Sequence, residues 1–579
     1  MSTTAINLVS FVPRWVSRLP RRGRSVFLTV AAGLVAGLLT VGFQAAMGGI
    51  FNAGIKHFSH ESFTFFAVAS LVVIVTTAFI SGWLMNSYCP EAAGSGIPQL
   101  KVAMWKDFGY MKFRVVWVKF IAGVLQIGGG SSMGREGPSV QLAGAAGSNL
   151  VGFLGEPKQR RRLGAATGAA AGLAAAFNTP LAAVTFVLEE LIGDLNSRLL
   201  GSVLLAGVLG ALITHGILGA QPAFTLAPLG ESDWHGYVLV PVVALLATVV
   251  GLLFQKWSIW LRPVRKQFRP GLRWMGPAVG ALICWALGII IFRETGRLGV
   301  FGLGYDDLSD ALAGKLLWTT AALLLGAKLL ATTACYGFGG CGGIFSPTLF
   351  FGAMAGAAVA GLAAMVIPLS SNDVVMLAIV GMSATLGAVV RAPVTSILIV
   401  FEMTHQFAIV PPLMIGALIS QGLARRFATH NFYDALLEQD GHDIERLRPL
   451  DNLRAWQEQS IKALANLKPV AMASLEIPEV ERVLKTSPYN RFPLVIDGVI
   501  HGIVLRDEAE EALRQKRTPK IFTADLLPPT AHLREMQSAL INSETGMVLV
   551  EGEKANSLGG LFTIHDLLRA QQAAVESPE

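Results

Sequence analysis

Charged residues are scarce in this sequence. Only 15% of its 579 residues are Asp, Glu, Lys or Arg, whereas soluble globular proteins contain about 25%. Hydrophobic residues make up 53%, and the mean hydropathy is +0.54. This shortage of charge disfavours a large soluble enzyme with an apolar core and favours a polytopic helical membrane protein.

Cysteines and catalytic motifs are also few. The four cysteines are Cys89, Cys284, Cys335 and Cys341, and each lies in or beside an apolar stretch. Their spacing fits no metal site, so we interpret them as small core residues. The sequence contains no HExxH, GxSxG or paired CxxC motif, which disfavours a membrane-embedded enzyme. We therefore expect no metal, no required cofactor and no enzymatic activity.

Long apolar runs fill most of the chain up to residue 424. They lie near 26–48, 65–87, 115–130, 138–154, 163–190, 198–219, 237–254, 275–292, 315–334, 343–367, 374–402 and 407–424. Several are too short, or too interrupted by Gly and Pro, to cross a bilayer as one helix. Broken helices are tolerated only where they line a cavity enclosed by protein, and transporters use them to build ion sites. No A-x-A cleavage site follows the first run, so we interpret it as a retained helix.

The net charge of +7 is concentrated beside these runs. The basic clusters are Arg14, Arg18, Arg21, Arg22 and Arg24 before the first run, then residues 158–162, residues 256–273, and Arg425 with Arg426. Positive charge flanking membrane spans predicts that both termini are cytoplasmic, and it disfavours nucleic-acid binding. Compact loops favour a multi-pass protein of the bacterial inner (plasma) membrane.

The sequence changes character near residue 427. Residues 440–579 are mixed and polar, and the runs FPLVIDGVIHGIVL and TGMVLVEG are typical of strands. We predict four parts: a cytoplasmic N-terminal segment (1–25), an all-α membrane domain of broken helices (26–438), a linker (439–464), and a cytoplasmic α/β domain (465–579). The last would comprise two halves, 465–516 and 522–572.

An internal repeat divides the membrane domain. Residues 168–189 match residues 381–402 at an offset of 213, which pairs Pro180 with Pro393 and Glu189 with Glu402. A weaker match pairs residues 134–139 with 343–348. Two related halves predict a pseudo-symmetric transporter with its substrate near the middle of the membrane. The match does not show whether the halves are inverted.

Three short motifs share one design: GSGIP (94–98), GREGP (134–138) and GIFSP (343–347). In each, a Gly-containing turn precedes Pro and an apolar helical stretch, which is typical of a helix N-terminus. Helix N-termini present free N–H groups and about half a positive charge. Three converging N-termini would bind an anion without a fixed cation. A full positive charge could hold the anion too tightly, so its absence allows the anion to be released. The alternative is that the motifs are ordinary kinks.

Glutamates stand at critical places in this arrangement. An acidic residue in mid-membrane costs about 2.5–3.5 kcal/mol and is functional by default, so Glu136 could compete with an anion and carry a proton. The alternative is a structural ion pair between Arg135 and Glu136. Glu189, Glu190 and Glu402 end the repeated helices. Adjacent Glu189 and Glu190 should point in different directions, one pairing with a basic residue and the other passing protons to Glu136.

Together these motifs resemble the CLC family of anion channels and transporters over about residues 25–440. The resemblance rests on GSGIP, GREGP, GGIFSPTLF (342–350) and the Tyr of NFYDALL (431–437), in the family's order. The polar tail resembles a pair of CBS subdomains, with GIVLRD (502–507) and GLFTIHDLL (560–568) near their ends.

This resemblance implies a homodimer in which each subunit has its own anion pathway. Ser95 and Tyr433 would offer hydroxyls, and Ile344 and Phe345 backbone N–H groups, to a central anion. The full anion site would comprise Ser95, Gly96, Ile97, Arg135, Gly137, Ile344, Phe345 and Tyr433.

The resemblance also makes Glu136 the gating glutamate and Glu190 the internal proton glutamate. Channel members typically carry an apolar residue at the second position, so Glu190 favours exchange of chloride for protons. A passive voltage- or pH-gated chloride channel is the alternative. Ser95 favours chloride because nitrate-preferring members carry Pro there. Fluoride exporters depart from GSGIP and GREGP, which this chain retains.

The tail departs from the family pattern. The nucleotide-binding pattern G-x-x-T-x-x-D is present in the second half as Thr563 and Asp566, whereas Leu505 and Glu508 replace these residues in the first. An adenine nucleotide could therefore bind through the second half only, or the tail could be a structural dimerisation module. A sensor that is merely anchored in the membrane is disfavoured, because an anchor needs only one or two spans.

Overall fold

The computed structural model describes residues 18–219, 234–444, 469–552 and 556–568, together with Val16, Phe224, Ile461, Asn466 and Lys554. Of Arg21, Lys266 and Pro270 it describes the backbone alone. Contacts divide the chain into two compact units, Met1–Arg448 and Pro449–Glu579. Most of the predicted N-terminal segment, most of the predicted linker and residues 569–572 of the second tail half lie outside the described residues.

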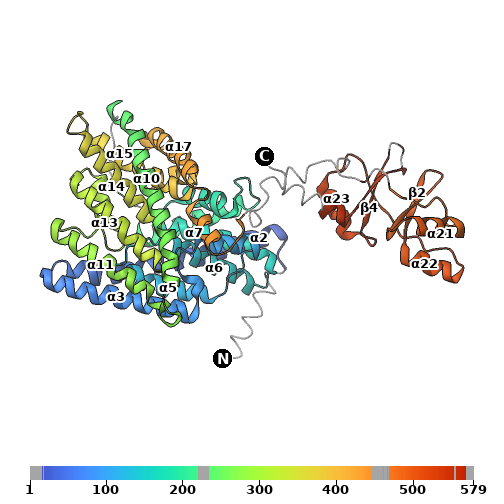
Figure 1. The fold of residues 1–579 in the computed structure, drawn as a ribbon, viewed down its shortest axis with the longest axis horizontal. Helices are drawn as coiled ribbons and strands as arrows, with labels where there is room; N and C mark the ends of the chain where they lie inside the picture. Colours follow the sequence, from blue (N-terminus) through green and yellow to red (C-terminus); the bar gives the residue numbers. More distant parts are fainter. Residues whose placement is uncertain are drawn as a thin grey trace. The chain divides into compact units, whose positions relative to one another are not determined.

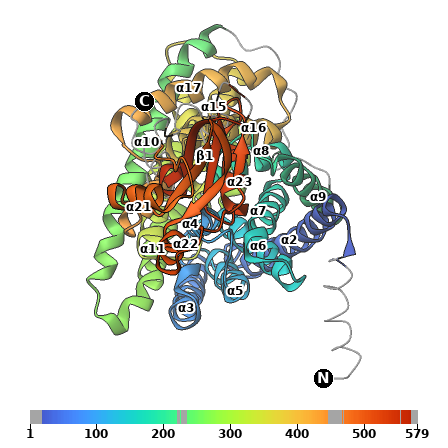
Figure 2. The same ribbon diagram turned by 90° about the vertical axis from the view of Figure 1, so that its right-hand side faces the viewer.

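The first unit is built from helices (Figures 1 and 2). In chain order they are α2 (Arg21–Phe51), α3 (Phe63–Tyr88), α4 (Ile97–Lys106), α5 (Arg114–Gly128), α6 (Glu136–Phe153), α7 (Arg161–Phe177), α8 (Pro180–Phe186), η4 (Val187–Ile192), α9 (Leu200–Leu218), α10 (Trp234–Lys266), α11 (Gly276–Thr295), α12 (Tyr305–Leu312), α13 (Trp318–Gly337), α14 (Phe345–Ala363), α15 (Ser371–Val390), α16 (Pro393–Thr404), α17 (Val410–Phe427) and α18 (Phe432–Gln439). The predicted helical character of this unit is confirmed.

Within the described residues, nine helices are long and apolar enough to cross a membrane. Others are much shorter: α4 has 10 residues and α16 has 12. At 1.5 Å per residue, α16 spans about 18 Å, well short of a hydrocarbon core of about 30 Å. The broken helices predicted from Gly and Pro are therefore present.

The two repeated segments break at equivalent positions. Asn178 (φ 60°) ends α7 and Arg391 (φ 59°) ends α15, both in the left-handed conformation. Pro180 and Pro393 then begin α8 and α16, where proline's missing N–H costs nothing. The offset of 213 found in the sequence therefore corresponds to one helix–break–helix unit that occurs twice.

Glycine lets the helices that carry the motifs pack closely against a neighbour. In the first half, a Cβ on Gly168 of α7 would collide with the Ala143 carbonyl of α6. In the second, a Cβ on Gly381 of α15 would collide with the Gly352 carbonyl of α14. These two helix pairs make the most extensive helix contacts of the unit, so α7 and α15 fix the positions of α6 and α14.

The second unit contains strands and helices, as predicted. Strand β1 (Arg491–Ile496) pairs antiparallel with β2 (Val499–Leu505); β4 (Met547–Glu551) pairs parallel with β3 (Asp525–Leu527) and antiparallel with β5 (Leu558–Thr563). The helices are α21 (Ile477–Thr486), α22 (Arg506–Gln515) and α23 (Leu533–Asn542).

The two predicted halves of the tail exchange segments. Asn466, at the start of the first half, pairs with Leu561 of β5, and Phe522, at the start of the second, pairs with Ile503 of β2. Apolar residues of both sheets form one cluster, comprising Ile500, Ile503, Met547, Leu549 and Leu561. The halves therefore share a core.

The close packing of α14 against α15 can be tested with one methyl group. We expect Gly381→Ala to lower the free energy of unfolding by about 1–3 kcal/mol, the usual cost of overpacking. The matched control is Gly326→Ala in α13, where a Cβ would meet nothing within 4 Å and alanine favours the helix. Melting temperatures in detergent compare the two, and a wild-type value for Gly381→Ala would contradict the close packing.

Candidate functional site

The three Gly/Pro motifs meet in the structure. The Gly94 N–H donates to the Gly340 carbonyl (2.9 Å), and the Gly342 N–H donates to the Gly94 carbonyl (3.3 Å). Gly134 and Gly343 exchange two backbone hydrogen bonds, of 2.8 and 2.6 Å. The motifs begin α4, α6 and α14. The prediction of converging helix N-termini is confirmed.

Glycine is required where these motifs touch. Gly96 adopts φ 88°, and a Cβ there would collide with the Gln141 side chain of α6. A Cβ on Gly137 would collide with Ser95 and crowd Gly343. Ser95 and the first turn of α6 can therefore lie together only because residue 137 has no side chain.

Glu136, the first residue of α6, is fully buried. Its carboxylate accepts hydrogen bonds from the backbone N–H of Ser346 (3.3 Å), from the Ser346 hydroxyl, and from the Tyr305 hydroxyl (3.3 Å). Ser346 is in the first turn of α14. The Glu136 carboxylate thus occupies the positive end of a neighbouring helix, where a free anion would also be stabilised.

Arg135 does not pair with Glu136 among the described residues. Its guanidinium lies over the Tyr305 ring, 5.4 Å from the centroid, and its Nε atom is buried without a hydrogen-bond partner there. The two adjacent charges therefore point to different neighbours, and the structural ion pair considered as an alternative is not formed.

Ser95 and Tyr433 contribute buried hydroxyls close to one another. Ser95 is 1% exposed and Tyr433 0%, and neither hydroxyl has a hydrogen-bond partner among the described residues. The Tyr433 hydroxyl has Ser95, Glu136 and Glu190 among its polar neighbours.

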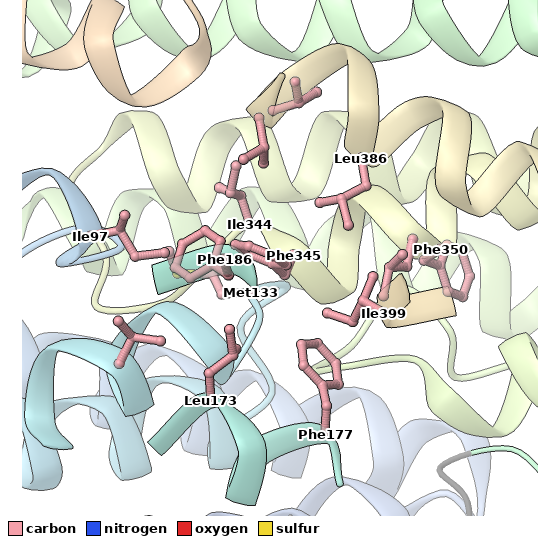
Figure 3. Close-up of a cluster of buried hydrophobic side chains, with 14 of the residues drawn as sticks. Ile97, Met133, Leu173, Phe177, Phe186, Ile344, Phe345, Phe350, Leu386 and Ile399 are labelled. Atoms are coloured by element: carbon pink, nitrogen blue, oxygen red, sulfur yellow. The ribbon is translucent and has the colours of Figure 1, made fainter. Parts of the chain in front are cut away.

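The start of α14 adds backbone donors in an apolar setting. No acceptor among the described residues contacts the N–H groups of Ile344 or Phe345. Figure 3 shows both residues in the same apolar cluster as Ile97 and Phe186, and the Phe186 and Phe345 rings lie 5.2 Å apart. Hydroxyl and N–H donors surrounded by hydrocarbon can bind an anion that has left water.

Glu190 lies in a buried polar network. The Lys101 ammonium donates to Glu190 (2.6 Å) and to Asp434 (2.7 Å), and the Asn431 amide also donates to Glu190 (3.1 Å). These contacts join η4 to α4 and α18. The neighbouring Glu189 instead accepts from Thr395. The two acids do point in different directions, but the proton residue implied by the resemblance is the one with a basic partner.

Two fully buried lysines hold the loops around the site, and sequence reasoning missed both. Lys119 donates to the carbonyls of Ala92 (2.9 Å) and Gly94 (2.7 Å), and Lys328 to those of Gly299 (2.7 Å) and Gly302 (3.0 Å). The offset that aligns Pro138 with Pro347 also aligns Lys119 with Lys328. Extending the weaker repeat toward the N-terminus would have revealed them.

Comparison with known proteins agrees with this geometry. A family model described as voltage gated chloride channel matches residues 77–425. The chain belongs to this family. Members are transporters or channels rather than enzymes.

Solved structures of this family resemble the chain. A slow cyanobacterial Cl⁻/H⁺ antiporter is 26% identical, with a TM-score of 0.64 over 73% of this chain and 98% of that chain. A eukaryotic CLC transporter is 21% identical, with a TM-score of 0.62 over 94% and 97%. A CLC-type fluoride/proton antiporter is 21% identical, with a TM-score of 0.58 over 71% and 97%. The last two show the fold alone.

The repeated glutamates have a structural role in this family member. Glu402 accepts from the N–H groups of Leu181 (2.9 Å) and Ala182 (2.7 Å) in the first turn of α8. Glu189 accepts from the N–H (3.0 Å) and hydroxyl (2.8 Å) of Thr395 in the first turn of α16. Each repeat therefore caps the helix of the other.

The residues assigned to nucleotide binding contact each other. The N–H (2.9 Å) and hydroxyl (2.7 Å) of Thr563 both donate to one oxygen of Asp566. In the first half, Glu508 pairs with Arg517 and accepts from the Lys520 N–H (2.9 Å). The Arg517 guanidinium lowers the pKa of the Glu508 carboxyl. Glu508, which stands where Asp566 stands in the second half, therefore already has a cationic partner.

The reciprocal caps predict a loss of stability. Glu402→Ala leaves two N–H groups at the start of α8 without their acceptor, so we expect the free energy of unfolding to fall by about 1–3 kcal/mol. The control is Glu294→Ala, because Glu294 is an exposed acid at the end of α11. Equal melting temperatures for the two variants in detergent would show that the cap contributes nothing.

Proposed function

We propose that the protein is a homodimeric chloride/proton antiporter of the bacterial inner (plasma) membrane, with an anion pathway in each subunit. Glu136 would compete with chloride for one position and carry the exchanged proton. The observation that supports this is the Glu136 carboxylate at the start of α14, bonded to the Ser346 N–H. A carboxylate held by helix N–H groups is an internal substitute for the substrate anion.

The exchange would follow from the charge of Glu136. While the carboxylate is charged, it accepts three hydrogen bonds and blocks the start of α14. A proton removes its charge and weakens those bonds, so the side chain can leave and chloride can enter. The N–H groups of Ile344 and Phe345 and the hydroxyls of Ser95 and Tyr433 would then hold chloride. Because dipoles rather than a fixed cation bind it, release remains fast.

The substrate and the coupling have separate support. The family description, voltage gated chloride channel, favours chloride as the substrate. The similarity to a cyanobacterial Cl⁻/H⁺ antiporter favours its exchange for protons. Ser95 and the retained GSGIP and GREGP motifs favour chloride over nitrate and fluoride. Glu190 would supply protons, as the resemblance implies, and it is a buried acid in the same helical unit.

A passive chloride channel is the second candidate, and one observation favours it. The Glu190 carboxylate is bonded to the Lys101 ammonium and the Asn431 amide. A proton carrier must gain and lose a proton in each cycle, whereas an ammonium partner favours the charged carboxylate. If Glu190 stays charged throughout, it is a structural ion-pair residue and the protein conducts passively.

The first test concerns Glu136. Glu136→Ala should abolish proton movement and make chloride flux independent of pH. Flux at neutral pH should rise about tenfold or more, because each hydrogen bond to a charged group contributes about 1.5–3 kcal/mol. Paired chloride and pH recording from purified protein in liposomes measures both. Glu136→Gln, which imitates the protonated side chain, should behave similarly. An unchanged pH dependence would refute the role of Glu136.

The second test separates exchanger from channel. Glu190→Val should stop proton movement while chloride flux survives, since Lys101 keeps Asp434 as a partner. Glu189→Gln is the matched control, because it changes the adjacent acid and retains an oxygen for Thr395; it should move protons like the wild type. If chloride flow through the wild-type protein never drives protons against their gradient, the protein is a passive channel and the antiporter proposal is wrong.

A further inference from the structure

Tyr305 is a residue of the site that neither the motifs nor the resemblance identifies. It is the first residue of α12, after Gly304 with φ 76°. The offset that aligns Pro138 with Pro347 places Tyr305 opposite Gly96, at the start of α4. The two helix starts are thus equivalent in the repeat: one follows Ser95, and the other carries a tyrosine.

The Tyr305 hydroxyl joins Glu136 to α14. It lies 3.3 Å from one Glu136 carboxylate oxygen and 2.8 Å from the Ser346 hydroxyl, which itself donates to that oxygen. Because each hydroxyl has one proton, Tyr305 donates either directly to Glu136 or to Ser346, whose own proton goes to Glu136. In both arrangements the Tyr305 hydroxyl supports the charged carboxylate. Arg135 covers the Tyr305 ring.

The backbone that carries Tyr305 is anchored independently of Glu136. Lys328 binds the carbonyls of Gly299 and Gly302 just before α12. Arg297 pairs with Asp307 (3.0 Å) and Asp310 on α12 itself. The Tyr305 ring also packs edge-on against Phe224, with 5.4 Å between the ring centroids. The hydroxyl is therefore held in place, and it cannot follow the carboxylate far.

We propose that Tyr305 is a positioning residue that latches the charged Glu136 carboxylate in the blocking position and thereby sets the pH at which the pathway opens. The inference rests on the proposed gating role of Glu136. A fixed phenol donates to a carboxylate, but the bond weakens when the carboxylate gains a proton. The latch therefore holds only the charged form.

The sign of the effect follows from this preference. Tyr305 from α12 and Ser346 from α14 donate to Glu136. The other titratable or charged groups nearby are Tyr433 from α18 and Arg135, whose guanidinium lies over the Tyr305 ring. Removing the Tyr305 donor removes a stabilisation of the charged form alone. Glu136 is then protonated at a lower proton concentration, so the pathway should open at a higher pH.

The experiment compares Tyr305→Phe with wild-type protein in liposomes over a pH series. We expect the pH of half-maximal chloride flux to rise by about one unit, a tenfold lower proton concentration. Tyr88→Phe is the matched control: the Tyr88 ring packs against Trp83 and Trp117, and phenylalanine keeps that packing. The control profile should not move. An unmoved profile for Tyr305→Phe overturns the latch.

A double-mutant cycle tests whether Tyr305 acts through Glu136. In a Glu136→Gln background, Tyr305→Phe should change neither flux nor its pH profile, and an equal shift in both backgrounds overturns the latch. If Glu136→Gln alone leaves proton coupling and pH dependence intact, the proposed gating role fails, and the latch fails with it. Ser346→Ala removes the other hydroxyl donor and should shift the profile in the same direction. It supplies the same readout if Tyr305→Phe does not fold.

Discussion

The site depends on backbone hydrogen bonds between loops that are far apart in the sequence. Gly94 is bonded to the segment around Cys341, and Gly134 to Gly343. These bonds bring the starts of α4, α6 and α14 together, so that N–H groups unpaired within each helix face a common region. The same bonds place Glu136 of α6 within reach of Ser346 of α14. Without them, each motif would be an isolated break in a membrane helix.

Buried charge in this domain is compensated locally and in different ways. Lys101 faces two carboxylates, whereas Lys119 and Lys328 face only carbonyl oxygens among their hydrogen-bond acceptors. Carbonyl dipoles thus replace a counter-charge at Lys119 and Lys328. At Lys101 the compensation comes from carboxylates, and the three ionised groups would carry a net charge of −1. The lysines that hold the loops of the site and the lysine beside Glu190 are therefore compensated by different kinds of group.

Local sequence signals predicted much of this arrangement. Gly and Pro marked the starts of α4, α6 and α14, because Gly permits close backbone contact and Pro is tolerated in the first turn of a helix. Pro180 and Pro393 likewise marked the starts of α8 and α16. The repeat identified Glu189 and Glu402 as equivalent. The polar composition and strand-like runs after residue 427 predicted the α/β tail.

The partners of the buried polar side chains could not be predicted from the sequence. Lys101 and Glu190 are 89 residues apart, and Glu136 and Tyr305 are 169 apart. Their contact depends on how the loops fold, which no local pattern records. The π-helical form of η4 also decides which acid faces Lys101 and which faces Thr395, and helical periodicity alone could not assign them.

The exchange of caps between the repeats has a consequence for the origin of the fold. Glu402 serves α8, and Glu189 serves α16, so neither half is electrostatically complete by itself. A polypeptide with only one repeat would bury a carboxylate without its N–H donors and a helix start without its cap. A second copy of the same polypeptide would supply the missing partner for each. Fusion of two such copies into one gene would then have made permanent a contact that already held them together.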